Sequence, residues 1–155
     1  MTKLISWVNN LFAPAKHIPE ALTLLVARLA IFTVFWRSAQ TKITGGEFLG
    51  QNWAFWDVTS TTFTLFEYEY DLPLIPADIA AYLATFGEFF LSLLLLFGLF
   101  TRLGAAGLLA MTAVIQFLVY PSAWPTHILW LAPLLYVLKA GPGKLSLDYL
   151  LSRKA

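Results

Sequence analysis

The chain has 155 residues and a formal net charge of +1; 59% of its residues are hydrophobic and only 12% are charged. Soluble domains carry about 25% charged residues, so this composition excludes nearly every soluble enzyme. The charge balance also lacks the basic excess with which proteins bind nucleic acid. The length predicts a single domain over residues 1–155.

Residue types that carry redox and metal chemistry are scarce. Cysteine is absent, and the histidines are His17 and His127. The absence of cysteine excludes disulfides, thiolate catalysis and cysteine-ligated clusters. We therefore predict no metal site and no tightly bound cofactor. No nucleophile–base spacing or phosphate-binding loop indicates an enzyme that acts alone, which favours an accessory role.

The first dozen residues predict a short amphipathic helix. Leu4, Val8, Leu11 and Phe12 would share one helical face. The apolar run is shorter than the roughly 7–15 residues of a secretory signal. We expect this helix to lie in the membrane interface, and the alternative is a frayed tail.

Four apolar segments follow, and each predicts a membrane-spanning helix because a span needs about 17–25 apolar residues. The predicted spans are residues 21–38, 78–100, 103–120 and 124–139, with an outer loop at 41–77. The expected fold class is therefore an all-α integral membrane protein. Its architecture would be a four-helix transmembrane bundle with an ordered aromatic outer loop between the first and second helices.

The outer loop is rich in tryptophan, phenylalanine and tyrosine, whereas disordered segments are poor in them. Residues 51–66 could hold a short helix, but residues 63–70 also alternate as a strand does. Two roles are open for the loop. It could form an aromatic belt at the headgroups, or a lid over an outward-facing pocket.

Lysine and arginine residues predict the orientation. Seven of them flank the spans on the side of both termini, whereas the other side carries only Arg37 and Lys42. Positive residues favour the cytoplasmic side. Both termini are therefore expected in the cytoplasm, and the loop outside.

Arg28 and Glu88 are ionisable residues within predicted spans. A charge at that depth costs at least about 2.5–3.5 kcal/mol and normally has a partner. Counted at about 1.5 Å per residue from Glu20 and Asp78, the two lie at similar depths. We predict a buried ion pair between Arg28 and Glu88. It would either fix the helix register or belong to a proton- or quinone-coupled site.

A candidate ligand pocket is expected near the outer ends of the third and fourth helices. Gln116 and His127 can lie at similar depth there, with Trp36, Gln40 and Trp130 as neighbours. Polar groups beside aromatic walls suit a quinone head group or another small amphipathic ligand. The alternative is a histidine that is simply hydrogen-bonded at a helix start.

Five stretches, which cover most of the chain in order, carry a family resemblance: VARLAIFTVFWRSAQTKI, LFEYEYDLPLIPADIAAYLATFGE, LFGLFTRLGA, MTAVIQFLVYPSAWPTHILW and GPGKLSLDYLL. Together they resemble the DoxX-like family of small bacterial four-span membrane proteins. The resemblance implies a multi-pass protein of the bacterial inner (plasma) membrane. The family takes its name from a membrane subunit of a thiosulfate:quinone oxidoreductase, and other members are linked to oxidative-stress complexes. The absence of cysteine argues against sulfur chemistry on this chain.

The leading hypothesis is an accessory subunit of a quinone-linked redox or stress-response system. Quinone would bind in the outward-facing pocket, and a periplasmic or membrane redox protein would hold the cofactor. The alternative is a non-catalytic membrane anchor or assembly partner for a periplasmic protein, docked by the outer loop. A third hypothesis, a small transporter, is disfavoured because no inverted repeat is detectable.

Overall fold

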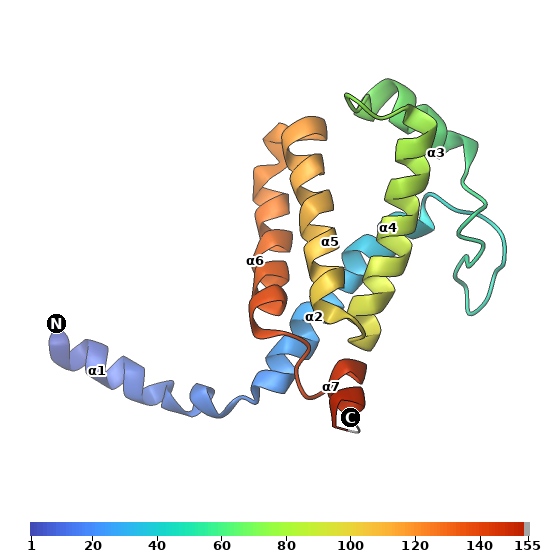
Figure 1. The fold of residues 1–155 in the computed structure, drawn as a ribbon. Coiled ribbons are helices and arrows are strands. Elements are labelled where there is room, and N and C mark those ends of the chain that lie inside the picture. Colours follow the sequence, from blue (N-terminus) through green and yellow to red (C-terminus); the bar gives the residue numbers. More distant parts are fainter. Residues whose placement is uncertain (154–155) are drawn as a thin grey trace.

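The computed structural model describes residues 1–153, and its regular elements are helices (Figure 1). The main ones are α2 (Glu20–Gln40), α4 (Ala77–Phe97), α5 (Thr101–Val114) and α6 (Trp124–Ala140). Helix α2 contacts α4 and α6, and α5 contacts the same two helices. Consequently α4 and α6 lie on opposite sides of this helical core.

Three helical segments are long and apolar enough to cross a membrane: Glu20–Gln40, Ala77–Phe97 and Thr101–Val119. The third consists of α5 and the π-helical segment η3 (Ile115–Val119). The first three predicted spans differ from these by a few residues at each end. Helix α6 has 17 residues and is shorter than these three. Membrane crossing by the fourth predicted span therefore stays a prediction, although the segment is helical.

The helical core has two ends. At the end that we call the tail end, the α4–α5 turn meets residues 141–153, which include the short helix α7 (Leu147–Ser152). The opposite end, the loop end, carries residues 41–76 and the α5–α6 connection. The main buried apolar cluster lies toward the tail end and draws on all four long helices: Leu24, Ile31, Phe35, Leu95, Ala105, Leu108, Leu134 and Val137. Burial of these side chains is the principal stabilising contact between the helices within the protein.

The loop between α2 and α4 contains helix α3 (Ser60–Leu65) and the π-helical turn η2 (Phe66–Tyr70). The Thr59 side chain caps α3 by accepting a hydrogen bond from the Thr62 backbone N–H. A short helix expected within residues 51–66 is thus present as α3. The strand-like interpretation of residues 63–70 is wrong, because this stretch is helical.

The N-terminal segment forms helix α1 (Thr2–Leu11) and the 3-10 turn η1 (Ala13–His17), which extend away from the helical core (Figure 1). The predicted helix is confirmed, and none of its residues is buried. An amphipathic helix with an exposed apolar face fits a membrane interface, although this placement stays a prediction.

Arg28 holds the tail end together. Its side chain is 1% exposed; Nη1 donates to the carbonyl of Pro142 at 2.9 Å and Nη2 to that of Leu145 at 2.7 Å. The guanidinium also lies against Gly98, just beyond α4. The expected Arg28–Glu88 ion pair is therefore wrong. The depth estimate assumed that α2 begins at one face of the membrane and α4 at the opposite face. In the structure Arg28 is level with the end of α4, about 15 Å along that helix from Glu88.

Asp148 completes the same contact. Its carboxylate accepts hydrogen bonds from the backbone N–H groups of Phe100 and Thr101, at 2.8 and 2.9 Å, and from the Thr101 hydroxyl at 2.8 Å. The carboxylate thus satisfies free N–H groups at the start of α5, where a negative charge is favourable. Residues 141–153 are therefore bound to both α2 and α5.

Replacing Gly98 with alanine should destabilise the protein more than the same change at Gly50. Both glycines have positive φ, +65° and +69°, so both substitutions incur a backbone cost of about 1–3 kcal/mol. A Cβ at Gly98 would also lie 2.1 Å from Arg28 Nη1 and 2.5 Å from Ser146 Cβ, whereas Gly50 has open space. Thermal unfolding in detergent micelles measures the difference. Equal midpoints for the two variants would contradict this account of the tail end.

Candidate functional site

A buried ion pair joins the start of the loop to α4. Lys42 Nζ lies 2.9 Å from Oε2 of Glu88 and 3.2 Å from Oε1. The ammonium also donates to Oγ of Ser38 at 2.7 Å. Lys42 is 6% exposed and Glu88 is 4% exposed. Each charge therefore has hydrogen-bonding partners, without which its burial would be strongly unfavourable.

Local structure explains how this pair forms. Helix α2 ends at Gln40, and the Lys42 backbone N–H still bonds to the Ala39 carbonyl at 2.9 Å. Lys42 thus lies one turn beyond Ser38, and its long stem carries the ammonium back into the protein. The sequence interpretation missed this partner by counting Lys42 as an exposed loop cation. A possible signal was the serine one turn earlier.

The ion pair borders a cavity of about 350 Å³ at the loop end, between α2, η2, α4, α5, η3 and α6. Its polar lining residues are Ser38, Tyr70, Glu88, Tyr120 and His127. Its apolar wall consists of Phe66, Leu72, Ile75, Ala80, Leu83, Ala84, Ala110, Met111, Val114, Ile115, Val119 and Trp130. A few polar groups in an apolar cavity of this size are typical of a small-molecule site.

His127 is fixed in this wall by its neighbours. Its Nδ1 lies 2.7 Å from Oε1 of Gln116, whose Nε2 donates to the Pro121 carbonyl at 2.7 Å. The ring centroids of His127 and Trp130 are 4.9 Å apart. The structure thus brings together three of the five residues assigned to the candidate pocket. Gln116 positions His127, and the other two line the cavity.

The remaining two pocket residues, Trp36 and Gln40, have another role. Trp36 Nε1 donates to Oε1 of Gln51 at 2.7 Å. Gln40 donates to the Asn52 carbonyl at 3.0 Å and accepts from the Asn52 N–H at 2.7 Å. Neither lines the 350 Å³ cavity. Their assignment to the pocket is therefore corrected, because their polar groups bind the outer loop.

Two tyrosines lie at one side of the cavity, and their rings meet edge to face with centroids 5.7 Å apart. The Tyr120 hydroxyl donates to the carboxylate of Glu69 in η2. This hydrogen bond, with a smaller contribution from burial, raises the pKa of Tyr120. Burial is the main cause that raises the pKa of Tyr70. Both phenols are therefore neutral at pH 7.

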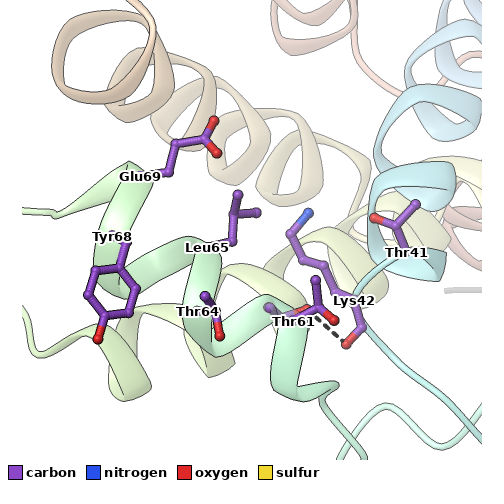
Figure 2. Close-up of a pocket in the computed structure, with 8 residues that line it drawn as sticks. Thr41, Lys42, Thr61, Thr64, Leu65, Tyr68 and Glu69 are labelled. Carbon is purple, nitrogen blue, oxygen red and sulfur yellow. Dashed lines mark hydrogen bonds between the residues drawn. The ribbon is translucent and has the colours of Figure 1, made fainter.

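A second hollow, of about 650 Å³, lies on the other side of the ion pair and is shown in Figure 2. Figure 2 shows Thr41 and Lys42, just beyond α2, facing side chains of α3 and η2. Its full lining is Thr41, Lys42, Thr61, Thr62, Thr64, Leu65, Tyr68 and Glu69, and we call it the polar groove. Because Lys42 lines the groove and Glu88 lines the apolar cavity, the ion pair separates the two hollows.

Replacing Lys42 with methionine should lower the free energy of unfolding by about 3–5 kcal/mol, because Glu88 would be left buried without its partner. The double variant Lys42→Met, Glu88→Leu should recover most of this loss. Lys144→Met, at an exposed lysine, is the control. Denaturant titration in mixed micelles measures all three. A Lys42→Met protein as stable as the parent would contradict the pairing.

Replacing Glu69 with glutamine should lower the pKa of Tyr120 toward its ordinary value near 10, because the charged acceptor is lost. Phenolate absorbance during an alkaline titration measures this, with Glu67→Gln as the control at a neighbouring exposed glutamate. The raised pKa stabilises the fold below about pH 10, and this contribution disappears as the pH rises further. The stability difference between parent and Glu69→Gln should therefore shrink in alkali. An unchanged Tyr120 titration would refute the hydrogen bond.

Comparisons with known proteins find a family that covers most of the residues around the cavity. The family model DoxX matches residues 23–121, which include Lys42, Glu88 and Gln116, while His127 lies beyond the match. An uncharacterized protein of Haemophilus influenzae is 27% identical to the chain over 146 residues, which cover 89% of each sequence. No solved structure matches the chain.

Proposed function

We propose, from the premise that this chain belongs to the DoxX family of membrane proteins, that it binds a quinone in the 350 Å³ cavity. In this proposal it is an accessory subunit of a quinone-linked redox or stress-response system in the bacterial inner membrane. Helix α6 is the fourth span, and both termini face the cytoplasm. The carrying observation is a mostly apolar cavity whose wall includes the polar groups of Glu88 and His127.

The chemistry of the wall supports a quinone in particular. A quinone is a flat, apolar ring with polar oxygens at two opposite positions. Trp130 and Met111 offer an aromatic surface and a polarisable thioether to the ring. Glu88 on α4 and His127 on α6 come from helices on opposite sides of the core. Polar groups on two sides of an apolar space suit a ring of the quinone–hydroquinone couple, which carries an oxygen at each end.

Access to the cavity supports a ligand that dissolves in lipid. Leu83 on α4 and Val114 on α5 line the cavity and are 59% and 41% exposed. Figure 1 shows α4 and α5 diverging toward the loop end. In a bilayer this side of the protein would face acyl chains. A lipid-soluble quinone could then enter sideways between the two helices without crossing water.

The electron-transfer cofactor is assigned to another protein in this proposal. The chain has no cysteine, and the residues that the structure describes contain no cluster of three potential metal-ligating His, Asp or Glu side chains. We therefore propose a periplasmic or membrane redox protein as the partner, with this chain holding the quinone. The groove beside Lys42 and the outer loop lie on the face that we expect to be outside.

Filling the cavity tests the proposal. Ala110 lines the cavity, and Ala106 lies one turn earlier on α5 without lining it. Ala110→Leu should weaken binding of decylubiquinone at least tenfold, about 1.4 kcal/mol, whereas Ala106→Leu should bind like the parent. Quenching of tryptophan fluorescence in lipid nanodiscs measures the affinity. Equal affinities in all three proteins, or no binding by the parent, would overturn the proposal.

One observation favours the alternative of a non-catalytic anchor for a periplasmic protein. Phe48, Leu49 and Trp56 in the outer loop are 62%, 83% and 63% exposed. Such side chains could lie among headgroups or against a docked protein. If Leu49→Ser with Trp56→Ser removed a co-purifying chain, and the parent bound no quinone, the anchor would be favoured over the quinone site.

A further inference from the structure

The hydrogen bonds of His127 fix which of its ring nitrogens carries the proton. The Pro121 carbonyl can only accept a hydrogen bond, so the Gln116 amide must turn its NH₂ group toward it. The Gln116 oxygen therefore faces Nδ1 of His127, at 2.7 Å. Because an amide oxygen cannot donate, Nδ1 holds the proton. In the neutral ring Nε2 is then a hydrogen-bond acceptor.

Among residues 1–153, the hydrogen bond of the His127 ring runs through Nδ1, which leaves Nε2 without a partner, and the side chain lines the cavity. His127 is only 3% exposed, and its side chain lines the 350 Å³ cavity and also a smaller hollow of about 130 Å³ beside Gln116. Its unpartnered nitrogen is therefore available to a molecule bound inside the protein. The Gln116–Pro121 contact thus leaves His127 with a free acceptor in a side chain that lines the cavity.

Glu88 presents a second acceptor from the other side. Both of its oxygens accept hydrogen bonds from Lys42 Nζ. An ionised carboxylate has about four lone-pair sites, so it can accept further bonds but donates none. The lining also holds three hydroxyl groups: Tyr120 donates to Glu69, Ser38 accepts from the ammonium that pairs with Glu88, and Tyr70 packs edge to face against the Tyr120 ring.

From this pattern we infer that the cavity selects the reduced, dihydroxy form of its ligand, a hydroquinone, over the quinone. The inference rests on the proposed function and names the redox form that the site binds. A hydroquinone carries two O–H donors at opposite ends of its ring, which match two acceptors on opposite sides of the cavity. A quinone carries only acceptors and would face Glu88 and His127 with unmatched lone pairs. An unmatched buried polar group is unfavourable, so the two forms should differ in affinity.

Three small probes test the inference: 2,3,5-trimethylhydroquinone, the corresponding quinone, and the dimethyl ether of the hydroquinone, which keeps the ring but has no donor. Binding is measured anaerobically with the full chain in nanodiscs. The parent protein should bind the hydroquinone at least tenfold more tightly than either other probe.

The variant Gln116→Leu tests the role of the positioning residue. Without the amide, His127 can carry its proton on either nitrogen, so the ratio of hydroquinone to quinone affinity should fall toward one. A merely structural role of Gln116 would weaken both probes equally and leave this ratio unchanged. His127→Phe removes the acceptor itself and should also lower the ratio, which provides a second variant if the first does not fold.

The outcomes separate the two proposals. Equal binding of the hydroquinone and the quinone by the parent, abolished by Ala110→Leu, would overturn the inference and leave the proposed function in place. Equal binding of the hydroquinone and its dimethyl ether would also overturn it, because the donors would then be unused. Failure of the parent to bind any probe, decylubiquinone included, would overturn the proposed function itself.

Discussion

The loop end depends on burying the carboxylate of Glu88 within a helical core that has few other charges. The carboxylate needs a cation, and Lys42 supplies it by reaching back past the end of α2. That contact also fixes the start of the outer loop. The Lys42 carbonyl then accepts hydrogen bonds from the Thr59 N–H, at 2.9 Å, and the Thr62 hydroxyl, at 3.3 Å. Helix α3 and η2 come directly after Thr59 in the chain, and η2 contributes to the cavity wall. The ion pair therefore helps to position that wall through the start of the loop.

Features that depend on local sequence were predictable, whereas those that depend on how helices are offset were not. Hydropathy predicted the long helices. The short connection between the third and fourth helices predicted that Gln116 and His127 lie close together. The Arg28–Glu88 pair failed because hydropathy does not report the relative levels of α2 and α4. Lys42 was missed because a lysine beside a helix end is usually solvated, and only tertiary packing directs it inward. The fourth span and the orientation in the membrane stay predictions.

The two ends of the helical core differ in what fills them. Large aliphatic side chains and closely packed small residues occupy the tail end. A Cβ added at Gly104, for example, would lie 3.2 Å from the Cβ of Leu94. At the loop end, α3 and α5 each finish in a π-helical turn, at Phe66–Tyr70 and Ile115–Val119. These turns carry Tyr70 and Gln116, and π-helical turns are frequent at functional sites. No residue propensity predicts such a turn, so the irregular backbone around the candidate site could not be predicted from the sequence.

The contacts of Arg28 also constrain the order of events during biosynthesis. Its two carbonyl partners lie 114 and 117 residues later in the chain. Domains are synthesised from the N-terminus, so α2 leaves the ribosome long before Pro142 and Leu145 exist. During that interval the guanidinium must be held by water, lipid headgroups or the insertion machinery. The first long helix therefore acquires the hydrogen bonds of its buried arginine only after the segment beyond α6 has been translated.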